Sequence, residues 1–186
     1  ILVPAWSKAD EIADRLARAG IDHFVDGGKF FFHRDEVRFS LAALRALVDP
    51  GDGEAVVAAL RGLFGCSLEA LAAHRATGRG WRYTTDDAEG PAPVGPALRA
   101  LRDARKGAGG AGLVPAFDRV LERSGALLVW RLMPRAVGLA ANLDKLRELV
   151  RRFEADGLAG ARVVERIARV RDEGDAEGDL PLRPFE

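Results

Sequence analysis

The chain has one acidic run whose residue types suit acid-base chemistry. Asp86, Asp87 and Glu89 lie in the segment 77–96, which is rich in Gly, Thr, Asp and Pro and shows little periodicity. Paired carboxylates are the usual groups for general acid and base catalysis. A solvated loop is the default interpretation of such a run, and no other part of the sequence supports catalysis there. We therefore expect no catalytic residue, and a small free-standing enzyme built on this loop is the least favoured hypothesis.

Two clusters mix aromatic and basic side chains. Residues 30–32 are three phenylalanines between Lys29 and Arg34, and Arg79 precedes the run Trp81-Arg82-Tyr83. Aromatic rings stack on nucleic-acid bases, and Arg and Lys bind phosphates. Each cluster has a second interpretation, in which most of its rings pack into the domain's own core. Composition favours the core, and both interpretations stay open at this point.

Other familiar binding motifs are absent or incomplete. Residues 106–112 contain the spacing G-x-G-x-x-G, but a basic helix precedes it instead of a strand, and no carboxylate follows at the distance of a ribose-binding residue. We interpret it as a linker. The phosphate loop G-x-x-x-x-G-K-[ST] does not occur. His23, His33 and His74 lack metal-ligand spacing, and Cys66 is the only cysteine, so we expect no metal site and no internal disulfide.

Composition excludes several classes of protein. The 186 residues are 48% hydrophobic and 30% charged, which is ordinary for a globular domain and unlike disordered or collagen-like chains. The 28 basic and 28 acidic residues balance, without a basic or acidic tail. A dedicated nucleic-acid binder usually has a basic excess, so only a local basic patch is compatible with this composition. No apolar run is long enough to span a bilayer, and we expect a cytoplasmic protein without membrane contact.

The expected elements form a mainly α chain with a short β-α-β piece at its front. Residues 1–3 and 21–25 suit strands, with a helix between Ser7 and Gly20. The chain opens on Ile1 and its only methionine is Met133, so we expect a segment of a longer protein. Helical periodicity then continues from Arg34. About seven helices are expected, at 37–48, 56–63, 67–72, 98–101, 115–121, 139–153 and 163–170. An apolar run at 127–133 stops at Pro134, and the acidic tail 172–186 suits a connector.

The order of these elements carries a family resemblance. The strand and helix of residues 1–21 precede a pattern of the form G-G-x-x-F-x-x-R-x-E-[IV], and the apolar segments 41–50 and 60–65 follow it. The residues that match this signature are Gly27, Gly28, Phe31, Arg34, Glu36 and Val37. The chain resembles the UvrD/RecB/AddA-type superfamily-one DNA helicases, from the second motor domain into its helical insertion. Residues 141–146 also resemble a helix late in that insertion.

The resemblance implies both an organisation and a role. Residues 1–33 would belong to the RecA-like motor domain, 34–171 to the helical insertion (2B-like) subdomain, and 172–186 to a connector. Such a subdomain guides duplex DNA and regulates an ATP-dependent helicase of repair or recombination. Family members commonly carry an arginine near positions 3–6, where this chain has Pro4. The phosphate-binding lysine and the magnesium-binding carboxylates are also absent, so the resemblance implies ATP and magnesium for the parent protein and no ATPase activity in this segment.

Partners follow from the same resemblance. Forked or duplex DNA, the rest of the motor and a partner subunit are expected. The candidates for DNA contact are Lys29, Arg34, Arg79, Arg82 and Arg152. The alternative function is a helical protein-interaction module, in which exposed Leu and Trp side chains such as Trp130 contact a partner subunit.

Overall fold

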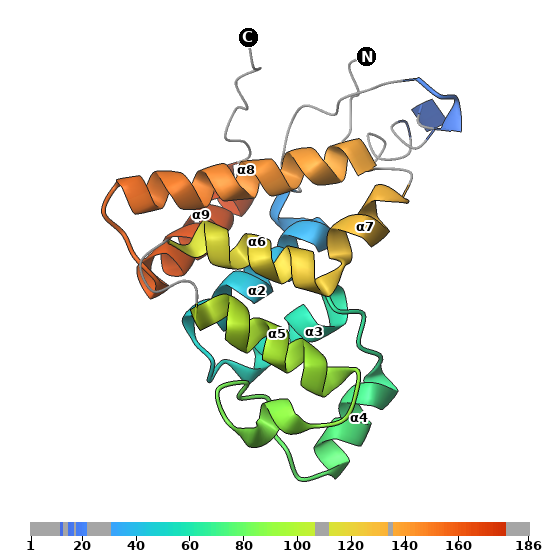
Figure 1. Cartoon of the computed structure of the whole chain (residues 1–186). Coiled ribbons are helices and arrows are strands. Elements are labelled where there is room, and N and C mark those ends of the chain that lie inside the picture. The colour runs from blue at the N-terminus through green and yellow to red at the C-terminus, as the bar shows by residue number, and fades with distance from the viewer. Residues whose placement is uncertain are drawn as a thin grey trace.

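The computed structural model describes residues 12, 15, 16, 18–21, 31–106, 112–133 and 136–177, without the side chains of 136, 137 and 173–177 (Figure 1). Across these residues the chain forms eight α-helices and no strand. The helices are α2 (Asp35–Val48), α3 (Gly53–Gly62), α4 (Leu68–Ala76), α5 (Val94–Lys106), α6 (Leu113–Ser124), α7 (Ala126–Arg131), α8 (Ala136–Ala155) and α9 (Ala161–Glu177). Two 3-10 helices, η2 (Phe31–His33) and η3 (Asp86–Glu89), complete them. The prediction of a mainly α chain is confirmed.

The front of the chain is described only in part. Ile12, Arg15, Leu16 and Arg18 are helical, and Gly20 takes the left-handed φ of 67° that commonly ends a helix. The strands expected at 1–3 and 21–25 lie outside the described residues except for Ile21, which is not in a strand. Gly27, Gly28 and Lys29 also lie outside them.

Local capping sets several of the helix starts. The Asp52 carboxylate accepts a hydrogen bond from the Ala55 amide at 2.9 Å, and the Ser67 hydroxyl accepts one from the Ala70 amide at 3.2 Å. These side chains satisfy amides that have no partner inside the first turn of α3 or α4. The expected loop 77–96 is shorter than predicted, because η3 lies within it and α5 begins at Val94. At the other end, α9 continues beyond Asp172 into the segment expected to be a connector.

Helix α2 lies at the centre of the domain (Figure 1). It contacts α3, α5, α6, α8 and α9, and its buried side chains occur around most of its circumference. Ala42, Ala43 and Ala46 are small enough to let neighbouring helices approach closely, while Leu44 and Leu47 fill the space between them. Complete burial of a leucine stabilises a fold by about 1.5–3 kcal/mol, so α2 organises much of the core.

Helix α8 lies across one end of the domain, and α4 lies at the opposite end (Figure 1). The buried residues of α8 follow the helical spacing that the sequence shows, from Leu139 through Leu143, Leu146 and Val150 to Phe153. This stripe faces α2, α6 and α9. None of the helices in the described ranges is both long and apolar enough to cross a bilayer.

The interpretation of Trp130 as an exposed contact residue is wrong. Its side chain is only 8% exposed, because α7 packs against α6 and α8 and turns this ring toward the core. Leu128 of the same short helix and Leu132 just after it lie on the outside, with 68% and 83% of their surface exposed. The core interpretation of the phenylalanines is confirmed for Phe31, which is 6% exposed; Phe32 packs partly against the core.

The contact between α5 and the preceding loop gives a direct test of this packing. A Cβ atom on Gly95 would overlap the carbonyl oxygen of Gly90, which belongs to the backbone and has no rotamer to move aside. We expect Gly95→Ala to lower the free energy of unfolding by about 1–3 kcal/mol, as overpacking does. Gly138→Ala on α8 is the control, since no atom lies within 4 Å of its Cβ position; it should stabilise the protein by about 0.5–1 kcal/mol. Urea unfolding of both variants measures the difference, and equal stabilities would contradict the described contact.

Candidate nucleic-acid interface

The loop between α4 and α5 is anchored to the central helix through Tyr83. The side chain is fully buried, and its hydroxyl donates a hydrogen bond of 2.6 Å to the carbonyl oxygen of Ala46 near the end of α2. Arg105 of α5 donates from Nε to the next carbonyl, that of Leu47, at 3.0 Å. The last carbonyls of a helix have no partner within it, so these two side chains satisfy groups that burial would otherwise leave unpaired.

Asp87 fixes the shape of the same loop. Its two carboxylate oxygens accept hydrogen bonds from the amides of Gly80, at 2.7 Å, and Arg82, at 2.9 Å. Glu89 lies 3.5 Å from Arg99 and 3.2 Å from Arg102. Two of the three carboxylates in the acidic run therefore have structural partners. No group of three or more potential ligands forms a metal site among the described residues, which include this loop.

Trp81 packs on its own domain. Its ring stacks on His74 with centroids 5.3 Å apart and planes at 19°, and the Arg75 guanidinium lies 5.9 Å from the ring centroid. His74 is fully buried, and its Nε2 lies 2.9 Å from the Gly80 carbonyl oxygen. With Tyr83 also buried, the core interpretation of the aromatic residues at 81 and 83 is confirmed, and the exposed guanidinium of Arg82 remains between them.

The structure does not bring the predicted DNA contacts together. Arg79 and Arg82 share the loop before α5, whereas Arg34 precedes the first turn of α2 and Arg152 is exposed on α8. Lys29 lies outside the described residues. Only Arg79 and Arg82 belong to the same loop. Arg82 lies over the turn after α2, since its Nη2 is 3.3 Å from the place that a Cβ atom would take if Gly51 had a side chain.

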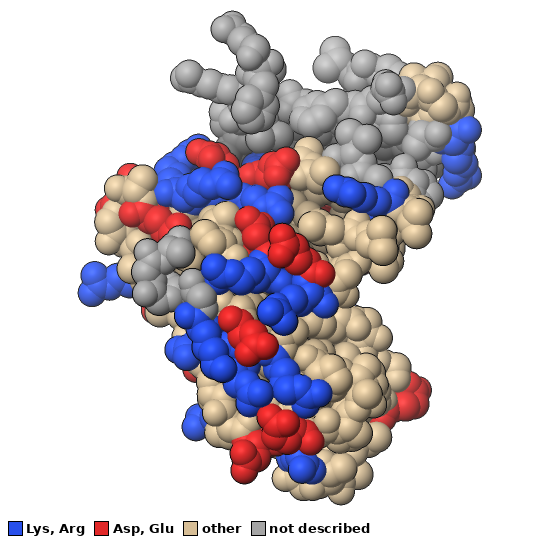
Figure 2. Space-filling view, in the orientation of Figure 1, with Lys and Arg blue, Asp and Glu red and all other residues tan. Residues whose placement is uncertain are grey.

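On the broad charged face of the domain, most of the positive charge is balanced by carboxylates on the same face. Figure 2 shows Lys and Arg side chains over α8, α6 and α5, with Asp and Glu between them. Arg147 of α8 binds Asp118 of α6 at 2.8 Å, and Arg123 of α6 lies 3.8 Å from Asp103 of α5. These pairs join neighbouring helices across the surface. Because carboxylates are interspersed among the cations, the face as a whole lacks the positive excess that grips phosphates.

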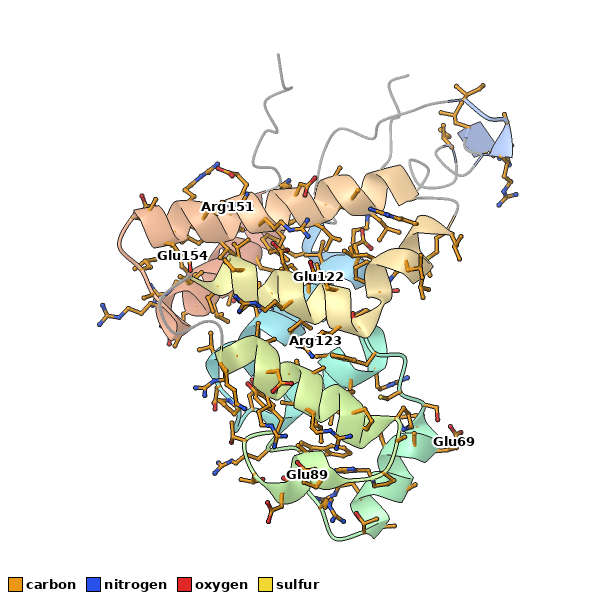
Figure 3. The ribbon with its side chains drawn as sticks, in the orientation of Figure 1. Glu69, Glu89, Glu122, Arg123, Arg151 and Glu154 are labelled. Carbon is orange, nitrogen blue, oxygen red and sulfur yellow. The ribbon has the colours of Figure 1, made fainter. Side chains whose placement is uncertain are left out.

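A shallow groove of about 570 Å³ between α6 and α8 has the same mixed charge. Arg151 and Glu154 of α8 line it together with Glu122 of α6 (Figure 3). Glu154 has a structural role, since its Oε1 accepts a hydrogen bond of 2.7 Å from the Leu113 amide at the start of α6. The remaining lining residues are Val114, Pro115, Asp118 and Arg119. With two arginines and three carboxylates, this groove has no preference for an anion.

A second, smaller hollow differs from this groove in its charge. Thr84, Arg102, Arg105 and Lys106 line a space of about 180 Å³, and no carboxylate belongs to its lining. The three cations follow the spacing i, i+3, i+4 at the end of α5, which places them on one helix face. This spacing can be read from the sequence, but these three residues are not among the binding-site candidates predicted from it. Thr84 is not recognisable from the sequence, because only the folded loop places it beside α5.

The remaining reactive residue types have ordinary surroundings. Cys66 is buried with 3% of its surface exposed, and burial raises the pKa of its thiol, which disfavours the reactive thiolate. Neither a scan against protein-family models nor a search of the curated proteins finds a match for this chain.

The anchor at Tyr83 has a consequence for stability at high pH. Burial raises the pKa of the Tyr83 phenol, with a smaller opposing effect from Arg105, because the charged phenolate is poorly solvated there. The folded state thus favours the neutral phenol. The contribution of the neutral Tyr83 phenol to the free energy of unfolding is complete below the ordinary tyrosine pKa of about 10 and is lost as the pH rises above that value.

Tyr83 is the only tyrosine, so the ultraviolet absorbance of phenolate reports on it alone. We expect phenolate to appear in native protein only at a pH well above that of an ordinary tyrosine, together with unfolding, and at about pH 10 in urea. Tyr83→Phe should lower the free energy of unfolding by about 1–3 kcal/mol at neutral pH, because the Ala46 carbonyl loses its partner. The variant should also lose less stability than the native chain between about pH 9 and roughly pH 11. A phenol that titrates like an ordinary tyrosine in folded protein would contradict the buried anchor.

Proposed function

We propose that this chain is the duplex-guiding and regulatory helical subdomain of an ATP-dependent DNA helicase of repair or recombination, with the start of the second RecA-like motor domain at its front. The sequence resemblance through Phe31, Arg34, Glu36 and Val37 supports this proposal, and the helical body after Arg34 is compatible with an insertion subdomain. The β-α-β piece of the motor is part of the proposal. ATP and magnesium would bind the parent motor.

The observation that carries the proposal is a basic edge made from two separate parts of the chain. Tyr83 and Asp87 hold the loop that contains Arg82, and two residues later this loop meets Arg102, Arg105 and Lys106 at the end of α5. Among the described residues, neither Arg82 nor Arg105 has a carboxylate within 4 Å. A few such cations on a neutral domain suit a guide that touches the phosphate backbone weakly and without reading the base sequence.

Binding of forked DNA tests this function. We expect weak binding that falls steeply with salt. Arg82→Glu should raise the dissociation constant about fivefold, which corresponds to roughly 1 kcal/mol. It should also reduce the slope of log K against log salt by about 0.9 for each phosphate that the variant no longer neutralises. Fluorescence anisotropy of labelled forked DNA at several salt concentrations measures both.

The matched control is Arg131→Glu, which reverses the same charge at an exposed position of α7. It should bind DNA like the native chain. Equal losses in the two variants would contradict a contact at the basic edge. ATP hydrolysis measured in the same samples should stay at background, and turnover by a clean preparation would overturn the assignment as an accessory part.

The second candidate function is a protein-interaction module, and an exposed apolar face formed by α7 and the two residues after it favours this function. Leu128, Val129, Leu132 and Met133 are all exposed large apolar residues in one short stretch. Exposed apolar patches commonly mark contact sites for proteins. This face would replace Trp130 as the contact with a partner subunit. Unchanged DNA anisotropy across all variants, together with loss of a co-purifying subunit from Leu128→Ser/Leu132→Ser, would favour this function over the first.

A further inference from the structure

The geometry points to a binding site for a single phosphate group in the hollow formed by Thr84, Arg102, Arg105 and Lys106. The site deepens the proposed function and rests on it in one respect: in a DNA-guiding domain the phosphate would be a backbone phosphodiester. The same chemistry would also accept inorganic phosphate.

Arg105 is held in position before any ligand arrives. Its Nε is used in the hydrogen bond to the Leu47 carbonyl, which fixes the plane of the guanidinium at the end of α2. Within the described part of the chain, its two terminal nitrogens make no hydrogen bond or ion pair. An arginine whose fork is already oriented loses little conformational entropy when it binds an anion through two parallel hydrogen bonds.

Arg102 adds a second restrained guanidinium. One terminal nitrogen donates to Glu89 at 3.2 Å, while its Nε is buried and has no hydrogen-bond partner among the described residues. A buried donor without an acceptor costs free energy; this Nε has almost no accessible surface, so an anion in the hollow would lower that cost through its charge and not through a direct hydrogen bond. Because Glu89 does not line the hollow, the ion pair holds the guanidinium from outside, and the other terminal nitrogen of Arg102 makes no hydrogen bond among the described residues.

Thr84 and Lys106 complete the donor set. The Thr84 hydroxyl makes no hydrogen bond in the described structure, and Lys106 is mostly exposed, with its ammonium 3.7 Å from Asp103. The helix dipole would be enough by itself to favour cations in the last turn of α5. The dipole does not explain why a loop hydroxyl and two guanidinium groups with unused donors meet at the same hollow.

The lining also decides the class of ligand. It offers charged and hydroxyl donors beside the aliphatic stems of the same cations and contains no aromatic ring, since the neighbouring Trp81 is stacked on His74 and Tyr83 is buried. A base or sugar ring would find no surface for stacking. A phosphate group, with several acceptor oxygens and a negative charge, matches these donors.

The test uses two probes on one set of variants. Inorganic phosphate is titrated into the whole chain and followed by amide and side-chain chemical shifts, and labelled forked DNA is followed by anisotropy. Thr84→Val and Lys106→Gln alter exposed positions and should leave the fold intact, which thermal unfolding checks. Arg105→Lys keeps the charge and removes the fork. Arg131→Gln is the control at an exposed arginine of α7, outside the hollow.

We expect phosphate to shift the resonances of the residues that line the hollow. The double variant Thr84→Val/Lys106→Gln should weaken phosphate binding about tenfold, and Arg105→Lys should weaken it by slightly less. If the same variants weaken DNA binding and flatten its salt dependence, the ligand is a backbone phosphodiester. If phosphate binding falls and DNA binding does not, the site stands and takes free phosphate, and its link to DNA is lost. If phosphate causes no saturable shift in the hollow, or if all variants match Arg131→Gln, the site is overturned, even where DNA binds elsewhere on the domain.

Discussion

The end of helix α2 is the constraint on which the proposed binding surface depends. A helix leaves its last carbonyls without partners, and Ala46 and Leu47, near the end of α2, are buried residues. Tyr83 and Arg105 donate to the carbonyls of Ala46 and Leu47, one from a loop and one from another helix. Satisfying these two oxygens brings the 77–93 loop and α5 together. The edge that carries Arg82, Thr84 and the α5 cations is therefore a by-product of completing the core helix.

The charged residues of this domain divide into those that hold the fold and those that remain available. Arg147 and Asp118 join α8 to α6, and the carboxylates of Asp87 and Glu154 accept backbone amides. Exposed ion pairs of this kind contribute little each, but they remove cations from competition for an external anion. Other exposed arginines, such as Arg131 and Arg152, also have no carboxylate within 4 Å among the described residues, so the proposed phosphate contact depends on where the cations at the end of α5 gather.

Much of the fold was predictable because it depends on local pattern. The leucines of α8, the turn after Val48 and the cap at Ser67 follow from spacing and residue type, and the structure confirms them. The prediction that Trp130 is exposed was wrong for a physical reason: whether a short helix turns a ring inward depends on the helices it packs against. The site was predictable only in part. Arg82 is among the predicted contacts, whereas Arg105 is not, because its position depends on a bond to a residue far away in the sequence.

The sequence by itself determined that the chain is mainly helical, balanced in charge and without a motif for gripping a nucleotide. It also determined where most helices lie, since periodicity and capping act over a few residues. Only the tertiary structure decided which aromatic rings are buried, which carboxylates are used as clamps and which cations remain unpaired. Those outcomes depend on contacts between distant segments, such as Tyr83 with Ala46 and Thr84 with α5. No local pattern encodes such contacts, because each side chain's role is set by the partner that packing places beside it.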